Sequence, residues 1–134
     1  MNISGRGNLS NYEAIEIKAF VPAKDFKLCS EFYSKVGFEL KWSDSDLAYF
    51  SVDNSSFFLQ NHYVKEHADN FMMHLLVNNA DDWWSRIKAS NVVEEYGVSL
   101  GDPEDREWGL RDFTLIDPTG VLWRIGNNIT EKQS

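Results

Sequence analysis

Arg124 is the residue of this chain whose placement raises the sharpest chemical question. It follows a turn at 117–120 and lies in an apolar run, 121–125, that alternates as a strand does. A guanidinium inside such a strand needs a carboxylate or a bound ligand, because an unpaired buried charge is strongly unfavourable. The sequence leaves both possibilities open: Arg124 binds a ligand, or it forms a structural ion pair with Glu16 or Glu94.

The other groups able to do covalent or acid–base chemistry stand apart from one another. His74 is a single histidine on an otherwise apolar strand, which is more typical of an interior residue than of a catalyst. Cys29 falls on the apolar stripe of a helix, which favours a core position over a nucleophilic one. No Ser-His-Asp or Cys-His order can be assembled, and no glycine-rich phosphate loop occurs. We therefore predict no catalytic residue.

Length and composition restrict the class of protein. The 134 residues suffice for one domain, or for two small modules that share a core, and 43% of them are hydrophobic. The net charge of −8 argues against a nucleic-acid partner, since nucleic-acid-binding surfaces are basic. A single cysteine excludes an intrachain disulfide. No apolar run approaches the ~20 residues of a membrane span, and the first eleven residues lack the apolar core of a signal peptide. We expect a cytoplasmic protein without membrane contact.

Periodicity and capping residues predict the elements of the first half. Alternation predicts a strand over 14–21 with its isoleucines on one face. Asp25 is a typical N-cap for a helix over 26–36, and Gly37 is a typical terminator. Further strands are expected at 38–42, 47–52 and 55–60.

The second half repeats this order. A strand over 71–77 is followed by a helix over 80–90, and strands are expected at 92–97, 111–117 and 120–126. A shift of 54 residues superimposes Asp25 on Asn79 and Gly37 on Asn91. Agreement of cap and terminator at one offset indicates a duplicated βαβββ unit. The expected organisation is a flexible arm at 1–12, modules at 13–61 and 71–128, a polar linker at 62–70 and a tail at 129–134.

Three segments carry a resemblance to a known family: "VPAKDFKLCSEFYSKVGFEL", "DNFMMHLLVNNADDWWSRI" and "REWGLRDFTLIDPTGVLWRI". The chain resembles the vicinal oxygen chelate superfamily, also called the glyoxalase/bleomycin-resistance/dioxygenase fold. The resemblance implies an α+β fold in which two tandem βαβββ modules form a curved mixed sheet with a concave cleft. Because the family includes lyases, dioxygenases and pure binding proteins, the function has to be inferred from the cleft.

For the enzymes of this family, the resemblance implies four metal ligands, two on the first and fourth strands of each module. Counting from the helix caps and from Gly120 places Lys18, Phe58, Met72 and Arg124 at these positions. Two cationic side chains would repel a divalent ion, so we expect no metal and no cofactor. A register shift of two residues would instead offer His74, Gln60 and Glu16 as donors.

Within the family, the chain resembles the bleomycin-resistance proteins in particular. This resemblance implies a metal-free homodimer that holds a bulky cationic drug in clefts between its subunits. Carried over by position, Trp108 matches an aromatic residue that lines the drug cleft. Trp42 matches an aromatic residue on the second strand, and His74 matches an aromatic position on the fifth. Alternation adds Tyr49 and Phe58 to the concave face. The predicted ligand-binding residues are Lys18, Trp42, Tyr49, Phe58, Met72, His74, Trp108 and Arg124.

The function expected from this resemblance is stoichiometric capture of an aromatic, drug-like small molecule at a homodimer interface. The cationic Lys18 and Arg124 fit poorly with a cationic ligand and favour one that carries a carboxylate or phosphate. The alternatives are a divergent metal-dependent glyoxalase-like lyase or transferase, and a cleft that binds a partner protein. The sequence leaves open whether the two modules pair within one chain or between two chains.

Overall fold

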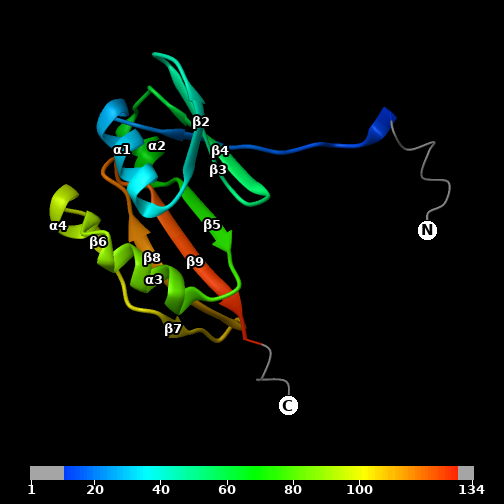
Figure 1. Ribbon diagram of the computed structural model, residues 1–134, viewed down its shortest axis with the longest axis vertical. Coiled ribbons are helices and arrows are strands. Elements are labelled where there is room, and N and C mark those ends of the chain that lie inside the picture. Colours follow the sequence, from blue (N-terminus) through cyan, green and yellow to red (C-terminus); the bar gives the residue numbers. More distant parts are fainter. Residues whose placement is uncertain (1–10, 130–134) are drawn as a thin grey trace.

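The computed structural model describes residues 11–129, so most of the predicted arm and tail lies outside the described residues. The described chain forms two sheets, one from each half, with helices packed against them (Figure 1). This arrangement confirms the predicted α+β class. No helix within residues 11–129 is long and apolar enough to cross a membrane.

The first half forms one four-stranded sheet and one helix. Its elements are β1 (Phe20–Pro22), α1 (Phe26–Val36), β2 (Glu39–Ser43), β3 (Leu47–Val52) and β4 (Ser55–Gln60). The strand order is β1-β4-β3-β2, with β1 parallel to β4 and the other pairs antiparallel. Strands β3 and β4 have the predicted bounds, because their alternation is strong and Asp53, at a φ of 48°, makes the turn between them.

The second half forms the other sheet, in the order β5-β9-β8-β6 with β7 also paired to β8. Its elements are α2 (Lys65–Asp69), β5 (Met72–Leu76), α3 (Ala80–Ala89), α4 (Val92–Tyr96), β6 (Ser99–Leu100), β7 (Glu104–Asp105), β8 (Leu110–Ile116) and β9 (Leu122–Asn128). Strand β5 is parallel to β9, as β1 is to β4 in the first sheet. Helix α2 occupies part of the stretch predicted as a polar linker.

The predicted caps and terminators of the two main helices are present. The Asp25 carboxylate accepts a hydrogen bond from the Leu28 N–H at 3.2 Å, and the Asn79 side chain accepts one from the Asp82 N–H at 3.0 Å. Gly37 and Asn91 both have positive φ, at 130° and 67°. A Cβ at Gly37 would also collide with the guanidinium of Arg86. These positions were predictable because caps depend on local backbone chemistry.

The strand predicted over 14–21 is shorter in the structure. Only Phe20–Pro22 pairs with β4, and no backbone hydrogen bond joins residues 13–18 to another strand within the described chain. This segment runs away from the body in an extended conformation (Figure 1), and Ile15 and Ile17 are 97% and 96% exposed. The alternation was interpreted correctly as extended backbone, but within residues 11–129 only the end of its apolar face, at Val21, is buried.

The strand predicted over 92–97 is wrong, because these residues form the helix α4. Val92 is buried and Tyr96, four residues on, packs edge-to-face on Phe32 of α1 with ring centroids 5.5 Å apart. This spacing is that of one helical face. Lys35 of α1 also pairs with Glu95 at 2.7 Å. Packing against α1 therefore decides the conformation of a segment whose valines favour a strand.

One hydrophobic core joins the two halves. Trp123 of β9 lies with its ring centroid 5.3 Å from that of Phe38 and 5.2 Å from that of Phe57. The Trp123 indole N–H donates to the Tyr33 hydroxyl at 2.8 Å, and that hydroxyl donates to the carboxylate of Asp117. Burial raises the pKa of both Tyr33 and Asp117. A side chain of α1 is thus tied directly to the turn before β9.

Candidate ligand-binding site

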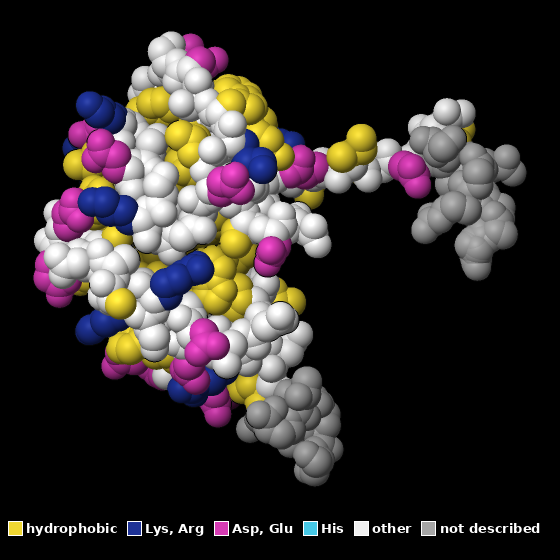
Figure 2. Space-filling model, in the orientation of Figure 1, with side chains coloured by type: hydrophobic (Ala, Val, Ile, Leu, Met, Phe, Trp, Pro, Cys, Tyr) yellow, Lys and Arg dark blue, Asp and Glu magenta, His cyan; other side chains and the backbone are white. Residues whose placement is uncertain are grey.

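An aromatic cluster covers the first sheet on the face that points away from the core. Alternation along β4 buries Phe57 and Leu59 and turns Phe58 outward. The ring centroid of Phe58 lies 5.1 Å from that of Phe20, 5.7 Å from that of Tyr49 and 6.3 Å from that of Trp42. Phe20 and Trp42 are 49% and 46% exposed. Figure 2 shows hydrophobic side chains gathered over the part of the surface formed by β2, β3 and β4.

Lys18 lies over this cluster, but its charge is compensated. Its ammonium is 5.3 Å from the ring centroid of Tyr49 and 5.2 Å from that of Phe58, distances at which a cation interacts with a ring face. The same ammonium forms a 2.7 Å ion pair with Glu16. The aromatic face of the first sheet therefore presents a neutral Lys–Glu pair rather than a free cation.

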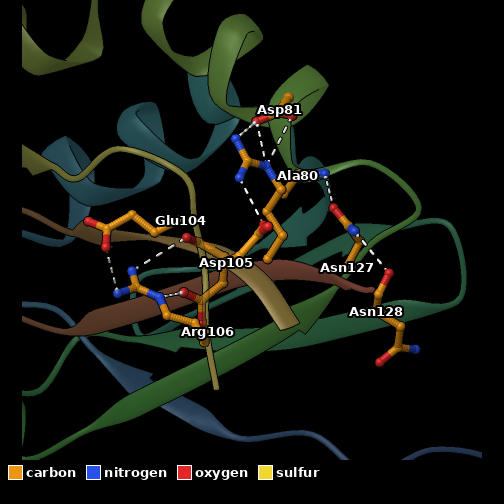
Figure 3. A network of polar contacts seen from close by, with 9 residues as sticks. Ala80, Asp81, Glu104, Asp105, Arg106, Asn127 and Asn128 are labelled. Atoms are coloured by element: carbon orange, nitrogen blue, oxygen red, sulfur yellow. Dashed lines mark hydrogen bonds and ion pairs between the residues drawn. The ribbon is translucent and has the colours of Figure 1, made fainter. Parts of the chain in front are cut away.

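Asp112 of β8 is the ion-pair partner of Arg124. Its carboxylate is fully buried and lies 3.2 Å from Nη1 of Arg124 and 2.7 Å from Nε of Arg106. Arg106 also reaches the exposed Glu104 at 3.4 Å (Figure 3). The predicted partners Glu16 and Glu94 are wrong, because Glu16 pairs with Lys18 and Glu94 lies on α4. An ion pair was one of the two possibilities left open for Arg124, and the structure supplies a carboxylate other than the two predicted ones.

Sheet register explains why Asp112 is the partner. Thr114 of β8 lies opposite Arg124, so Asp112 is the diagonal neighbour on the same face. Gly126 of β9 lies opposite Asp112, and a Cβ there would come within 2.6 Å of the Asp112 Cβ. The missed signals were the polar residue two positions from Thr114 and the glycine two positions after Arg124. These residues can be assigned to Arg124 only when the pairing register of β8 and β9, on either side of the turn, is known.

Arg111, the neighbour of Asp112 in β8, serves a structural role on the other face. It pairs with Asp81 of α3 at 3.2 Å and with Asp105 at 2.9 Å. Asn127 of β9 accepts a hydrogen bond from the Ala80 N–H at 2.7 Å, which satisfies one free donor at the start of α3. Figure 3 shows these contacts beside Arg106. The two adjacent residues of β8 therefore have different partners: Arg111 holds the start of α3, and Asp112 pairs with Arg124.

Other predicted ligand-binding residues surround Arg124 on the exposed face of the second sheet. His74 of β5 is its neighbour in the parallel pairing, and Met72, two residues earlier on the same face, is 58% exposed. The Trp108 side chain is 61% exposed, and its ring centroid lies 5.9 Å from the guanidinium carbon of Arg124. Trp108 therefore stands at the surface with a cation at its ring.

A groove of about 460 Å³ runs between the two sheets. It is bounded by residues 15–17, by the start of β4 and by β5, whose outer edge pairs with no strand within residues 11–129. Of the eight predicted ligand-binding residues, His74 alone lines this groove, while Glu16, the partner of Lys18, lines it from the opposite side. Seven of the eight predicted ligand-binding residues therefore lie outside the groove.

The eight predicted residues accordingly fall into two groups. Lys18, Trp42, Tyr49 and Phe58 lie together on the first sheet, and Met72, His74, Trp108 and Arg124 lie together on the second. No hydrogen bond, ion pair, ring–ring or cation–ring contact joins the two groups within residues 11–129. Sequence reasoning missed Phe20, which completes the aromatic face, and Asp112 and Arg106, which hold Arg124.

The residues at the family's metal-ligand positions do not fit a divalent ion. The two parallel pairings place Phe20 opposite Phe58 and His74 opposite Arg124. Lys18 and Met72 each lie two residues before the residue that pairs with Phe58 or Arg124. Phenylalanine supplies no donor, and guanidinium repels a cation. Within residues 11–129, no group of three His, Cys, Asp or Glu side chains is placed to hold a metal.

Cys29 offers no nucleophile for chemistry at this site. The thiol is fully buried in α1, and burial raises its pKa to about 11. Its sulfur lies 3.2 Å from the Thr119 hydroxyl, on the core side of the molecule. The core position predicted from helical spacing is the observed one.

Residues 17–125 match the model of the Glyoxalase/Bleomycin resistance protein/Dioxygenase superfamily. The chain belongs to this superfamily. Comparison with curated protein sequences gives no match.

Solved structures with the same fold include both binding proteins and an enzyme. A bleomycin-binding protein complexed with bleomycin is 21% identical with a TM-score of 0.72, over 86% of this chain and 99% of that one. The bleomycin-binding protein of Streptomyces verticillus, complexed with copper(II)-bleomycin, is 18% identical with a TM-score of 0.72, over 87% and 99%. Lactoylglutathione lyase of Agrobacterium tumefaciens is 14% identical with a TM-score of 0.63, over 86% and 94%. At these identities the likeness concerns the fold.

Proposed function

We propose that this protein is a metal-free binding protein that captures an aromatic small molecule in a cleft at a homodimer interface. The observation that carries the proposal is the aromatic face of the first sheet. Trp42 and Phe20 remain about half exposed although a complete core lies beneath the sheet. Flat exposed rings favour a planar ligand through stacking.

The residues of the two faces favour binding over catalysis. Lys18 is paired with Glu16, and Arg124 is paired with Asp112. Both carboxylates are therefore held in ion pairs and are not free to act as a general base. The counted metal-ligand positions hold Lys18, Phe58, Met72 and Arg124, which cannot complete a ligand set for a divalent ion. The bleomycin-binding proteins of the same fold provide the precedent for capture of a small molecule.

A second copy of the chain would complete the cleft. Residues 13–18 extend from the body with Ile15 and Ile17 almost fully exposed (Figure 1). Leu76 is 54% exposed at the end of strand β5, whose outer edge has no partner strand in the part of the chain that the structure describes. Apolar side chains in an extended arm and an open strand edge are complementary features, because an added strand satisfies the edge and buries the arm. The proposed dimer places the faces of two copies around one ligand.

Thermal-shift measurements with bleomycin and a panel of heteroaromatic compounds test the proposal. We expect at least one compound to raise the melting temperature of the wild type. Trp42→Ala should weaken its binding about tenfold, since an aromatic contact of ~1.5 kcal/mol is lost. Trp84→Phe is the matched control, because Trp84 packs on the helix side and donates to the Gly101 carbonyl. Absence of stabilisation by every compound would contradict the proposal.

A further inference from the structure

The charge pair on the second sheet presents its positive side to solvent. The Asp112 side chain is 0% exposed, whereas those of Arg124 and Arg106 are 31% and 22% exposed. Two guanidinium groups share this one carboxylate, and Glu104, the other partner of Arg106, is itself largely exposed. At Arg124, a ligand therefore meets the guanidinium and not the buried Asp112 carboxylate, while the exposed Glu104 lies beside Arg106.

Arg124 also keeps hydrogen-bonding capacity for a ligand. Its hydrogen bonds within the described chain run from Nη1 to Asp112, at 3.4 and 3.2 Å. A guanidinium has five N–H donors in a planar fork, and the donors on Nε and Nη2 make no hydrogen bond within residues 11–129. Such a fork matches the two oxygens of a carboxylate, phosphate or sulfonate.

Trp108 and His74 frame the exposed guanidinium. The Trp108 ring is 61% exposed and lies 5.9 Å from the guanidinium carbon, so a planar group stacked on this indole would carry a substituent to Arg124. His74, the neighbour of Arg124 across the parallel pairing, adds a second N–H donor on the same face. An aromatic body and an acidic substituent would then be bound by adjacent side chains.

We infer, on the basis of the proposed function, that the ligand is an aromatic acid whose anionic group binds Arg124 while its ring stacks on Trp108. This assignment differs from the cationic drug that the family resemblance implies. The net charge of −8 does not oppose it, because long-range repulsion is screened beyond about 8 Å at physiological ionic strength, whereas Arg124 acts at contact.

Four probes that share one ring system test the inference: 2-naphthoate, 2-naphthyl phosphate, the neutral 2-naphthamide and the cationic 2-naphthylmethylammonium. Their binding to the wild type is measured by isothermal titration calorimetry. We expect both anions to bind about tenfold more tightly than the amide, because a hydrogen bond to a charged group is gained. The cation should bind most weakly. The ratio of naphthoate to phosphate affinity distinguishes a carboxylate from a phosphate ligand.

Arg124→Gln should remove the preference for the anions and leave the affinity for the amide unchanged. Lys65→Met is the control, since Lys65 is an exposed cation of α2 that is paired with Asp69 and belongs to neither group of predicted ligand-binding residues. If Arg124→Gln does not fold, the ranking of the four probes on the wild type still decides the question. Equal binding of anion, amide and cation would overturn the inference while leaving capture intact. Failure of all four probes and of the heteroaromatic panel would overturn capture as well.

Discussion

At the level of single residues, the carboxylate of Asp112 organises the second sheet. It lies fully buried between Arg106 and Arg124, and the missing Cβ of Gly126 leaves it space. A buried carboxylate is stable in this position only because charged donors replace the water it has lost. The same pairing holds Arg124 in place at the surface while leaving part of its fork free.

Asp112→Asn should lower the free energy of unfolding by about 2 kcal/mol, since two charge-assisted hydrogen bonds are weakened in a buried site. The measurement is urea unfolding at neutral pH. Asp105→Asn is the matched control on the same structural unit, because Asp105 is exposed and its pair with Arg111 contributes less than about 1 kcal/mol. Equal losses in the two variants would show that Asp112 is not the central partner.

At the level of elements, the contact between α1 and the turn before β9 connects the halves. Asp117 accepts hydrogen bonds from the N–H groups of Thr119, Gly120 and Val121, each at 2.9 Å, and from the Tyr33 hydroxyl. Burial nevertheless raises the pKa of Asp117, because desolvation outweighs these favourable contacts. The folded chain therefore binds a proton at Asp117 more readily than the unfolded chain does.

The raised pKa fixes the sign of a pH effect. The contribution of Asp117 to stability is full below the ordinary value of 3.8 and declines as the pH rises through the higher folded value. Relative to Asp117→Asn, which does not titrate, the wild type should lose stability with rising pH across this window. Urea midpoints of both proteins from about pH 4 to 7 measure the difference.

Asp44→Asn provides a control of opposite sign. Hydrogen bonds from the backbone N–H groups of Asp46 and Leu47 lower the pKa of the exposed Asp44, so its contribution is lost as the pH falls. A difference between wild type and Asp117→Asn that stays constant with pH would contradict the account of Asp117.

The helices and strands also show which parts of the fold could be predicted from the sequence. The caps Asp25 and Asn79 and the terminators Gly37 and Asn91 were predictable, because each acts on backbone within a few residues. Helix α4 was not, because its conformation depends on packing against α1. The strand predicted over 14–21 was too long. The sequence pattern predicts extended backbone, but it does not show whether a neighbouring strand is present to pair with it.

The candidate site was predictable to a lesser degree. Alternation placed Tyr49 and Phe58 on one face correctly. The counted metal-ligand positions stay a prediction, because the strand register gives the neighbours of Phe58 and Arg124 and not the positions of ligands. Asp112 and Arg106 could not be assigned to Arg124 without the register of β8 against β9.

At the level of the whole molecule, the proposed dimer explains the exposed apolar arm. Ile15→Asp combined with Ile17→Asp should convert the dimer to a monomer, because two charges would be buried against a neighbouring chain. Light scattering coupled to size-exclusion chromatography gives the molar mass. Glu13→Gln in the same segment is the control and should leave the dimer intact. A wild-type protein that elutes as a monomer at micromolar concentration would contradict the proposed interface.

The central claim is that this member of the superfamily binds an aromatic ligand without a metal. The most direct measurement is calorimetric titration of the wild type with the best-stabilising aromatic compound, in the presence and absence of a strong chelator. The account predicts saturable binding with the same affinity in both, and binding about tenfold weaker in Trp42→Ala. Binding that disappears with the chelator and returns on addition of a divalent ion would contradict it.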